Sequence, residues 1–185
     1  MTAPNVGNPT HPAVTNQMRL PRTAALGPGR GGQQRLLIDA PAGAAEIYLH
    51  GATVTSWVPR GASEVIFTSR QAVFDGATAI RGGIPLCLPE FGVGINGDAV
   101  PRHGWARIAP WRLLTVTATD GGGVRALLSV SRDRLTALYE VEVGETLRLG
   151  LSLRNEGTEP RTVEAAAHTY LSVHDVTASR ISGLA

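Results

Sequence analysis

Residues 146–154 constrain the fold more than any other part of the sequence, because leucine fills every odd position from 147 to 153. Polar residues and glycine fill the even positions between them. Successive side chains of a β-strand point to opposite faces, so a period of two gathers these leucines on one face. The pattern predicts a strand with one face in a hydrophobic core and the other in solvent, as in antiparallel sheets.

Shorter runs of apolar and β-branched residues recur along the chain at intervals of roughly 8–12 residues, as in β-sandwiches. Turn residues separate them, and the 22 glycines and 12 prolines among 185 residues predict many turns and no long helices. The runs lie at residues 36–39, 46–50, 53–58, 64–68, 111–119, 124–131 and 161–171. Residues 164–168 could also form a helical turn, because alanine and glutamate favour helices. The sequence therefore predicts an all-β fold, an antiparallel β-sandwich.

The chain divides into two parts at about residue 34. Residues 1–34 are rich in proline, glycine, threonine and asparagine and have no hydrophobic period. This composition offers little apolar surface to bury, so we expect a flexible N-terminal segment. Residues 35–185 carry the strand patterns and are expected to belong to a single β-sandwich domain.

The composition excludes several functions. All 17 basic residues are arginine, and without lysine the chain can form neither a Schiff base nor a phosphate loop of the GK[ST] type. The 15 carboxylates leave a net charge of +2, which is close to balanced, so no nucleic acid partner is expected. Cys87 is the single cysteine, which excludes an intrachain disulfide and a multi-cysteine zinc site.

No metal, cofactor or membrane is expected either. The histidines lack the close spacing of metal ligands. No apolar run approaches the ~18 residues of a membrane span, and no basic segment followed by an apolar one marks a signal peptide. Because a single cysteine also suits a reducing compartment, a cytoplasmic protein is expected.

Two G-x-G-x-x-G motifs occur, at glycines 27, 29 and 32 and at glycines 92, 94 and 97. A dinucleotide site needs this motif between a strand and a helix, because the helix N-terminus holds the pyrophosphate. The first motif lies in the segment expected to be flexible, and Asp98-Ala-Val-Pro after the second does not open a helix. Neither motif predicts a nucleotide site.

Residues 74–107 combine many glycines with charged side chains, which predicts irregular backbone of the kind that carries function on a rigid scaffold. Within it, Arg81-Gly-Gly-Ile-Pro has two glycines that allow a tight turn or the close approach of a ligand. The alternative for Arg81 is a surface arginine beside a bend between strands.

Pro101-Arg-His-Gly-Trp-Ala-Arg adds further polar groups to the same segment. In an extended backbone His103, Trp105 and Arg107 share one face, and Arg102 points to the other. Arginine forks suit a phosphate or sugar oxygens, and Trp105 could stack on a sugar. The alternative is a tryptophan in the core, flanked by surface charges.

His168 follows three alanines, which leave space in front of its ring. A histidine with a pKa near 6.5 can donate and accept protons at neutral pH, so His168 is a candidate general acid or base. A hydrogen-bonded histidine in the core is the alternative.

Four segments, in order and spacing, resemble the D-hexose-6-phosphate mutarotases, also called glucose-6-phosphate 1-epimerases, which are relatives of aldose 1-epimerase. Any one segment is a weak signal, but the ordered set is specific. The segments are His50-Gly-Ala-Thr-Val-Thr-Ser-Trp, Phe74-Asp-Gly-Ala-Thr-Ala-Ile-Arg-Gly-Gly-Ile-Pro-Leu-Cys-Leu-Pro-Glu-Phe-Gly, Pro101-Arg-His-Gly-Trp-Ala-Arg and Ala167-His-Thr-Tyr-Leu-Ser-Val-His-Asp.

The resemblance implies a galactose mutarotase-like β-sandwich that interconverts the α and β anomers of a hexose 6-phosphate. It implies that His168 is the acid that protonates the ring oxygen, and that a glutamate in the C-terminal part of the family domain is the base. It also implies that Arg81 and Arg107 contact the substrate or its phosphate, and Arg102 and His103 are further candidates for substrate binding. The motifs do not distinguish glucose from galactose or mannose 6-phosphate.

The sequence departs from the family pattern in three places. Arg102 stands where many relatives have glutamine, and Glu90 stands where relatives often have a neutral residue. The sequence ends at Ala185, where relatives continue with strands that carry the base and a sugar-binding aspartate. We therefore expect a C-terminally truncated sandwich with impaired epimerase activity. The alternatives are a non-catalytic sugar-phosphate-binding module and a purely structural domain.

Overall fold

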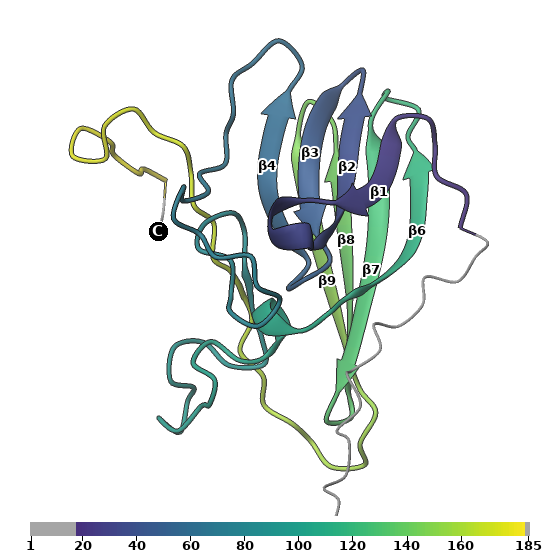
Figure 1. Ribbon diagram of the computed structural model, residues 1–185. Coiled ribbons are helices and arrows are strands. Elements are labelled where there is room, and N and C mark those ends of the chain that lie inside the picture. Colours follow the sequence, from purple (N-terminus) through teal and green to yellow (C-terminus); the bar gives the residue numbers. More distant parts are fainter. Residues whose placement is uncertain (1–17, 184–185) are drawn as a thin grey trace, which may run out of the picture.

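Antiparallel strands joined by short turns make up most of the regular structure, as the period of two predicts. The computed structural model describes residues 18–183. Its first four-stranded sheet has the order β1-β2-β3-β4, so each strand pairs with the one that follows it in the sequence (Figure 1). These strands are Ala24–Pro28, Gln34–Ala40, Gly43–Tyr48 and Thr53–Pro59.

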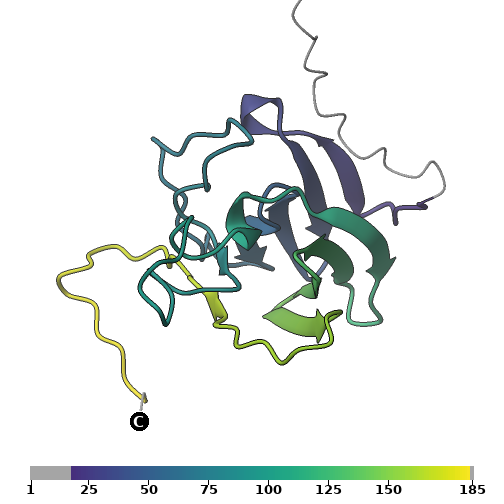
Figure 2. The same ribbon diagram turned by 90° about the horizontal axis from the view of Figure 1, so that it is seen from below.

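The second four-stranded sheet has the order β6-β7-β8-β9 and is also an antiparallel meander. Its strands are Arg112–Ala118, Val124–Arg132, Leu135–Val143 and Leu147–Asn155. The two sheets face one another, so the fold is the all-β sandwich that the sequence predicts (Figures 1 and 2). The loops between β4 and β6 and the C-terminal segment gather on one side of this sandwich.

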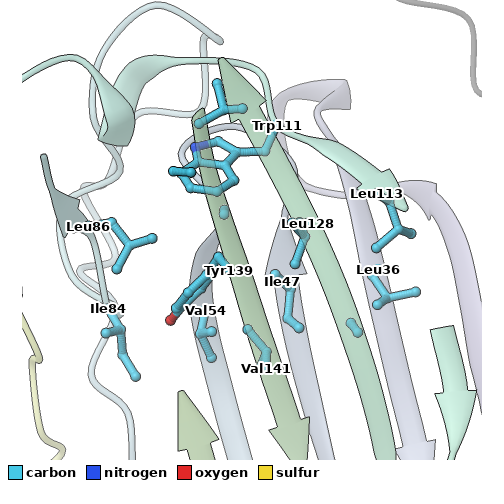
Figure 3. Packing of buried hydrophobic residues seen from close by; sticks show 14 of the residues in the cluster. Leu36, Ile47, Val54, Ile84, Leu86, Trp111, Leu113, Leu128, Tyr139 and Val141 are labelled. Carbon is cyan, nitrogen blue, oxygen red and sulfur yellow. The ribbon is translucent and has the colours of Figure 1, made fainter. Parts of the chain in front are cut away.

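The hydrophobic core lies between the two sheets. Alternate residues of β7 and β8 are fully buried, and Leu128 and Tyr139 face Leu36, Ile47 and Val54 of the first sheet (Figure 3). Because alternate side chains of a strand share one face, the opposite face of β7 and β8 is largely in solvent, whereas Tyr48, Thr53 and Thr55 are buried on the outer face of the first sheet. The core is therefore built by the same period of two that identifies the strands.

Strand β9 confirms the alternation of residues 146–154. Its leucines point inward and its polar residues are exposed, but the leucines are half-buried rather than fully buried. β9 is the last strand of its sheet and has a neighbour on one side only, which reduces the cover over its inner face.

Three regions differ from the predicted strands. β8 is not among the predicted strands, although its inward positions are all apolar. Residues 64–68 form isolated bridges instead of a strand, and in 161–171 only β10, Ala166–Ala167, is strand. Ile66 pairs with Leu171, Thr68 pairs with Gly82 and β10 pairs with β5 (Leu86–Cys87), so these segments lie outside both large sheets.

The N-terminal segment expected to be flexible contains regular structure. β1 pairs with β2 along its whole length, and residues 30–32 form a 3₁₀ turn, η1 (Arg30–Gly32). Order there comes from pairing with the next strand, which local composition does not reveal. The rest of that expectation, residues 1–17, lies outside the described residues.

Within residues 18–183, no helix has the length and apolar character needed to cross a membrane.

Candidate functional site

The predicted site residues lie on two chain segments that pair with each other beside the sandwich. β5, Leu86–Cys87, pairs with β10, so Cys87 lies opposite Ala166. The pairing continues past both strands, because the amide of His168 donates to the Pro85 carbonyl at 2.9 Å. The amide of Tyr170 likewise donates to Gly83 at 2.9 Å. These bonds bring His168 close to the segment that follows Arg81.

The glycines after Arg81 let the backbone pass close to β4. Gly83 has a φ of +72°, and a side-chain carbon built on it would lie 2.5 Å from the Val54 carbonyl oxygen. Its amide donates to Phe67 at 2.8 Å, and the amide of Ile84 donates to Val54 at 2.9 Å. The two glycines therefore allow a close approach, as predicted, but the partner is the backbone of β4 and Phe67 and not a ligand.

Residues 101–107 form a turn and not the extended segment that we expected. His103 and Gly104 both have positive φ, and the 3₁₀ turn η2, Ala106–Ile108, follows. The turn packs on Leu88, whose amide donates to the His103 carbonyl at 3.2 Å. Trp105 lies in the core at 5% exposure, so the core alternative for this residue holds and sugar stacking by Trp105 is excluded.

A cavity of about 260 Å³ opens where these segments meet. It brings together four of the five predicted site residues, two arginines and two histidines. It is lined by Ala79, Ile80, Arg81, Pro85, Cys87, His103, Arg107, His168 and Tyr170. No carboxylate belongs to this lining in the described part of the chain, so the charges around the cavity favour an anionic ligand.

The hydrogen bond from Gly92 fixes the tautomer of His103, which lines the cavity. The amide of Gly92 lies 3.2 Å from Nδ1, and because an amide can only donate, Nδ1 accepts. The proton of the neutral ring is then on Nε2. Burial lowers the pKa of His103, and the charges of Arg107, His168 and Arg102 lower it further. His103 is therefore neutral near pH 7.

Cys87 lies directly beside His103 in the cavity wall. Its Sγ is 3.5 Å from Nδ1 of His103. Burial raises the pKa of this thiol, and the nearby charge of Arg107 opposes the rise. The thiol is therefore protonated near neutral pH, and it packs against the ring as an uncharged group.

His168 is exposed and is flanked by aromatic rings. Its ring centroid lies 5.0 Å from that of Tyr170 and 6.5 Å from that of Phe91, with shallow interplanar angles in both pairs. The His103 ring meets it edge-on at 6.0 Å. The His168 ring is therefore placed by packing, and its nitrogens are free of protein hydrogen bonds within residues 18–183.

Arg107 is fixed by one bond, and its Nη1 makes no hydrogen bond within residues 18–183. Its Nη2 donates to the Arg102 carbonyl oxygen at 2.8 Å. Its Nε is buried and has no protein partner among the described residues. Arg81 is exposed at the cavity rim. Two guanidinium groups at one cavity can form paired hydrogen bonds with phosphate or carboxylate oxygens.

The structure does not bring Arg102 into the cavity wall; its side chain is exposed, and its backbone supports Arg107. Cys87 and Tyr170 line the cavity but were not predicted as site residues. Tyr170 had a usable signal, because it lies two residues after His168 and shares its face in an extended segment. Cys87 had none, since only the pairing with β10 places it there.

The two glycine-rich motifs have structural roles. Glycines 92, 94 and 97 all have positive φ within an irregular loop, and no helix follows them. Gly29 precedes η1 and lies against Tyr48. Residues 18–183 also contain no group of three or more histidine, cysteine or acidic residues that could hold a metal ion.

A β-sandwich with histidines and arginines around a lateral cavity has the galactose mutarotase-like architecture. The solved structures support this assignment. The Salmonella typhimurium protein named "putative mutarotase (YeaD)" superimposes with a TM-score of 0.76 at 28% identity, over 86% of this chain and 55% of that one. The structure of HI1317 gives a TM-score of 0.69 at 28% identity, over 86% and 56%.

The chain belongs to the aldose 1-epimerase family, whose sequence profile matches residues 34–185. An Escherichia coli K12 protein named "Putative glucose-6-phosphate 1-epimerase" is 32% identical over 158 residues, 80% of this chain and 52% of the relative. A Cenchrus ciliaris protein of the same name is 35% identical over 157 residues, 76% and 47%. The chain thus spans about half the length of the curated relatives it matches.

Proposed function

We propose that the protein binds a hexose 6-phosphate in the cavity between residues 79–87, 103–107 and 168–170 and takes part in its 1-epimerisation. The observation that carries the proposal is the meeting of Arg81, Arg107, His103 and His168 at one cavity without a carboxylate among its described lining residues. The name of the Escherichia coli relative, a glucose-6-phosphate 1-epimerase, supports the choice of substrate.

The arginines serve the phosphate in this proposal. A phosphate dianion is best held by guanidinium groups, which donate two parallel hydrogen bonds and stay charged at every physiological pH. Arg107 already has one donor anchored on Arg102, so its remaining donors are oriented before a ligand arrives. Arg81 provides the second charge from the opposite segment.

The histidines serve the sugar ring. In ring opening, His168 donates a proton to the ring oxygen as the bond between this oxygen and C1 breaks, and the bonding electrons stay on the oxygen. A base removes the proton of the C1 hydroxyl, which becomes the aldehyde. Rotation about the C1–C2 bond and the reverse steps give the other anomer. His103, neutral with its proton on Nε2, donates a hydrogen bond to a sugar oxygen.

The base is the group that the cavity lacks among residues 18–183. Family resemblance assigns it to a glutamate in the C-terminal part of the family domain. We therefore expect slow anomer exchange on the 185-residue chain, because loss of one partner in acid–base catalysis costs on the order of 10²–10⁴ in rate. The same absence favours the second candidate function, a module that binds sugar phosphates without chemistry.

Binding is tested first, by calorimetry with glucose 6-phosphate, glucose and inorganic phosphate. Arg81→Ala and Arg107→Ala should each weaken glucose 6-phosphate binding by about 10- to 100-fold, as expected for charged hydrogen bonds. Arg148→Ala, an exposed arginine on β9, is the matched control and should bind normally. Equal affinity for glucose and glucose 6-phosphate would contradict the proposal.

Catalysis is tested by NMR exchange spectroscopy between the anomers of glucose 6-phosphate. Slow exchange that disappears in His168→Asn supports an epimerase with an incomplete acid–base pair. Binding with no enzyme-dependent exchange supports the binding module. Rapid exchange that depends on His168 would overturn the expected impairment and would require a base that the described lining does not contain.

A further inference from the structure

The N-terminal glycine-rich segment packs on the loop that carries Arg81. Arg30, in η1, donates from Nη2 to the carbonyl oxygens of Arg70 at 3.2 Å and Ala72 at 3.3 Å. Its guanidinium carbon also lies 4.3 Å from the centroid of the Phe74 ring, which is cation–π geometry. One side chain thus holds the loop at three positions.

The backbone around Arg30 is closely fitted to the same loop. Gly31 has a φ of +63°, and a side-chain carbon built on it would lie 1.9 Å from the Phe74 carbonyl oxygen. The amide of Arg30 donates to the hydroxyl of Tyr48 at 2.9 Å, and the Tyr48 and Phe74 ring centroids are 4.8 Å apart. Only glycine permits this approach at position 31.

The contacts lead directly to the cavity. Tyr48, Ala72, Phe74 and Ile80 form a small buried cluster apart from the main core. Ile80 is 2% exposed, lines the cavity and immediately precedes Arg81. The Arg81 carbonyl accepts from the amide of Ser69 at 3.1 Å, which closes the loop at its base.

We infer that Arg30 is a positioning residue for the anion site: it clamps residues 70–80 onto β3 and so fixes Arg81 at the cavity rim. The expected effect of Arg30 on ligand binding rests on the proposed function, whereas the clamp itself does not. The loop contains no strand and depends on single side-chain contacts such as His50 to the Thr78 carbonyl at 2.8 Å. Removing the guanidinium therefore removes two hydrogen bonds from a loop that is otherwise held by the small cluster around Phe74 and by few backbone bonds.

Hydrogen exchange of the 185-residue chain tests the clamp without any ligand. In Arg30→Ala the amides of Ala72, Ala77 and Thr78 should exchange about tenfold faster, while amides of β7 and β8 keep their protection. Arg30→Lys retains the charge over Phe74 but not the guanidinium fork, and should give an intermediate rate. In Arg148→Ala these amides should exchange as in the unmodified chain. If Arg30→Ala fails to fold, Phe74→Leu, which removes the ring under the guanidinium, should also speed their exchange.

Glucose 6-phosphate binding tests the route through Arg81. Arg30→Ala should weaken binding about tenfold in the unmodified chain but leave it unchanged in an Arg81→Ala background, because a residue that acts through Arg81 cannot act without it. Unchanged loop exchange, or an equal loss of affinity in both backgrounds, overturns the inference. If the unmodified chain does not bind glucose 6-phosphate, the proposed function and the binding role fail together, while faster loop exchange still supports the clamp.

Discussion

The two sheets and the loops that carry the cavity are held together in different ways. β7 and β8 pair over nine consecutive residue positions, and their inner faces are fully buried. By contrast, β5 and β10 pair at two positions, and the remaining loop contacts are single hydrogen bonds and isolated bridges. The sheets are thus hydrogen-bonded continuously along their strands, whereas the loop backbone is bonded only at isolated positions, although loop side chains such as Leu88 and Trp105 pack into the core.

This difference separates stability from ligand binding. A change within the sheets should lower the global free energy of unfolding, because the core is shared by all strands. A change within the loops should alter the cavity first, because loops open locally at a lower cost than the whole fold.

The largest effect is expected in the core. Leu128→Ala removes a fully buried side chain between the sheets and should cost about 2–5 kcal/mol of unfolding free energy. Leu138→Ala, on the outer face of β8 at 37% exposure, is the matched control and should cost well under half as much. Urea denaturation measures both. Similar costs for the two variants would show that the sheets do not enclose the core described here.

The next effect is expected in the turn that carries His103. Gly104→Ala places a carbon 2.1 Å from the Leu88 carbonyl oxygen at a φ of +68°. It should lower the free energy of unfolding, measured by urea denaturation, by more than about 2 kcal/mol. Gly97→Ala has a similar φ of +78° but open space, and should cost only about 1 kcal/mol. Equal losses of unfolding free energy in the two variants would show that the packing of the turn on Leu88 does not contribute to stability.

A smaller, local effect concerns the protonation of His103. The folded state lowers the pKa of His103, so below pH 6.5 the unfolded chain binds more protons, and stability is lost as the pH falls through the lowered pKa. Arg107→Ala should raise the pKa toward its usual value, but not fully, because burial remains. NMR titration of the ring protons measures it. A pKa of 6.5 or above in the unmodified chain would contradict the described environment.

The smallest effect is expected on the solvent face of the second sheet. Arg125 donates to Glu142 at 2.6 Å between β7 and β8, with half of its side chain exposed. Arg125→Ala should lower the free energy of unfolding only slightly, less at high salt, and should leave glucose 6-phosphate binding unchanged. A double-mutant cycle with Glu142→Gln isolates the pair. A change in ligand affinity would show that sheets and loops are not separate in the way proposed.

The strands that alternate between clear turn signals were predicted from the sequence, and β8 shows why one was missed. β7 and β8 are joined by Asp133 and Arg134, which both have positive φ. Such a turn usually carries asparagine or glycine, so the sequence gives no sign that one strand ends and another begins. The order of β1 was missed for a related reason, since it depends on pairing with β2.

The candidate site residues were chosen from the sequence because their arginines and histidines lie beside glycines and small residues, outside the clearest alternating strands. Their relative placement was not predictable. Positions 81 and 168 are far apart in the sequence, and only the pairing of residues 83–87 with 166–170 brings them to one cavity. Trp105 is an example of a wrong local inference. Its sequence context suggested a contact with a sugar, but its ring lies in the core.

The sequence by itself determined the all-β class, the inward faces of most strands and the identity of the polar groups, because these follow from local periodicity and residue chemistry. The tertiary structure alone decided which of those groups meet. It placed Arg81, His103, Arg107 and His168 around one cavity, kept Arg102 outside it and ordered Arg30 against the loop. The physical reason is that these segments are joined largely through backbone groups, either by backbone hydrogen bonds or by the carbonyls that accept from Arg30, and backbone groups leave little trace in the sequence.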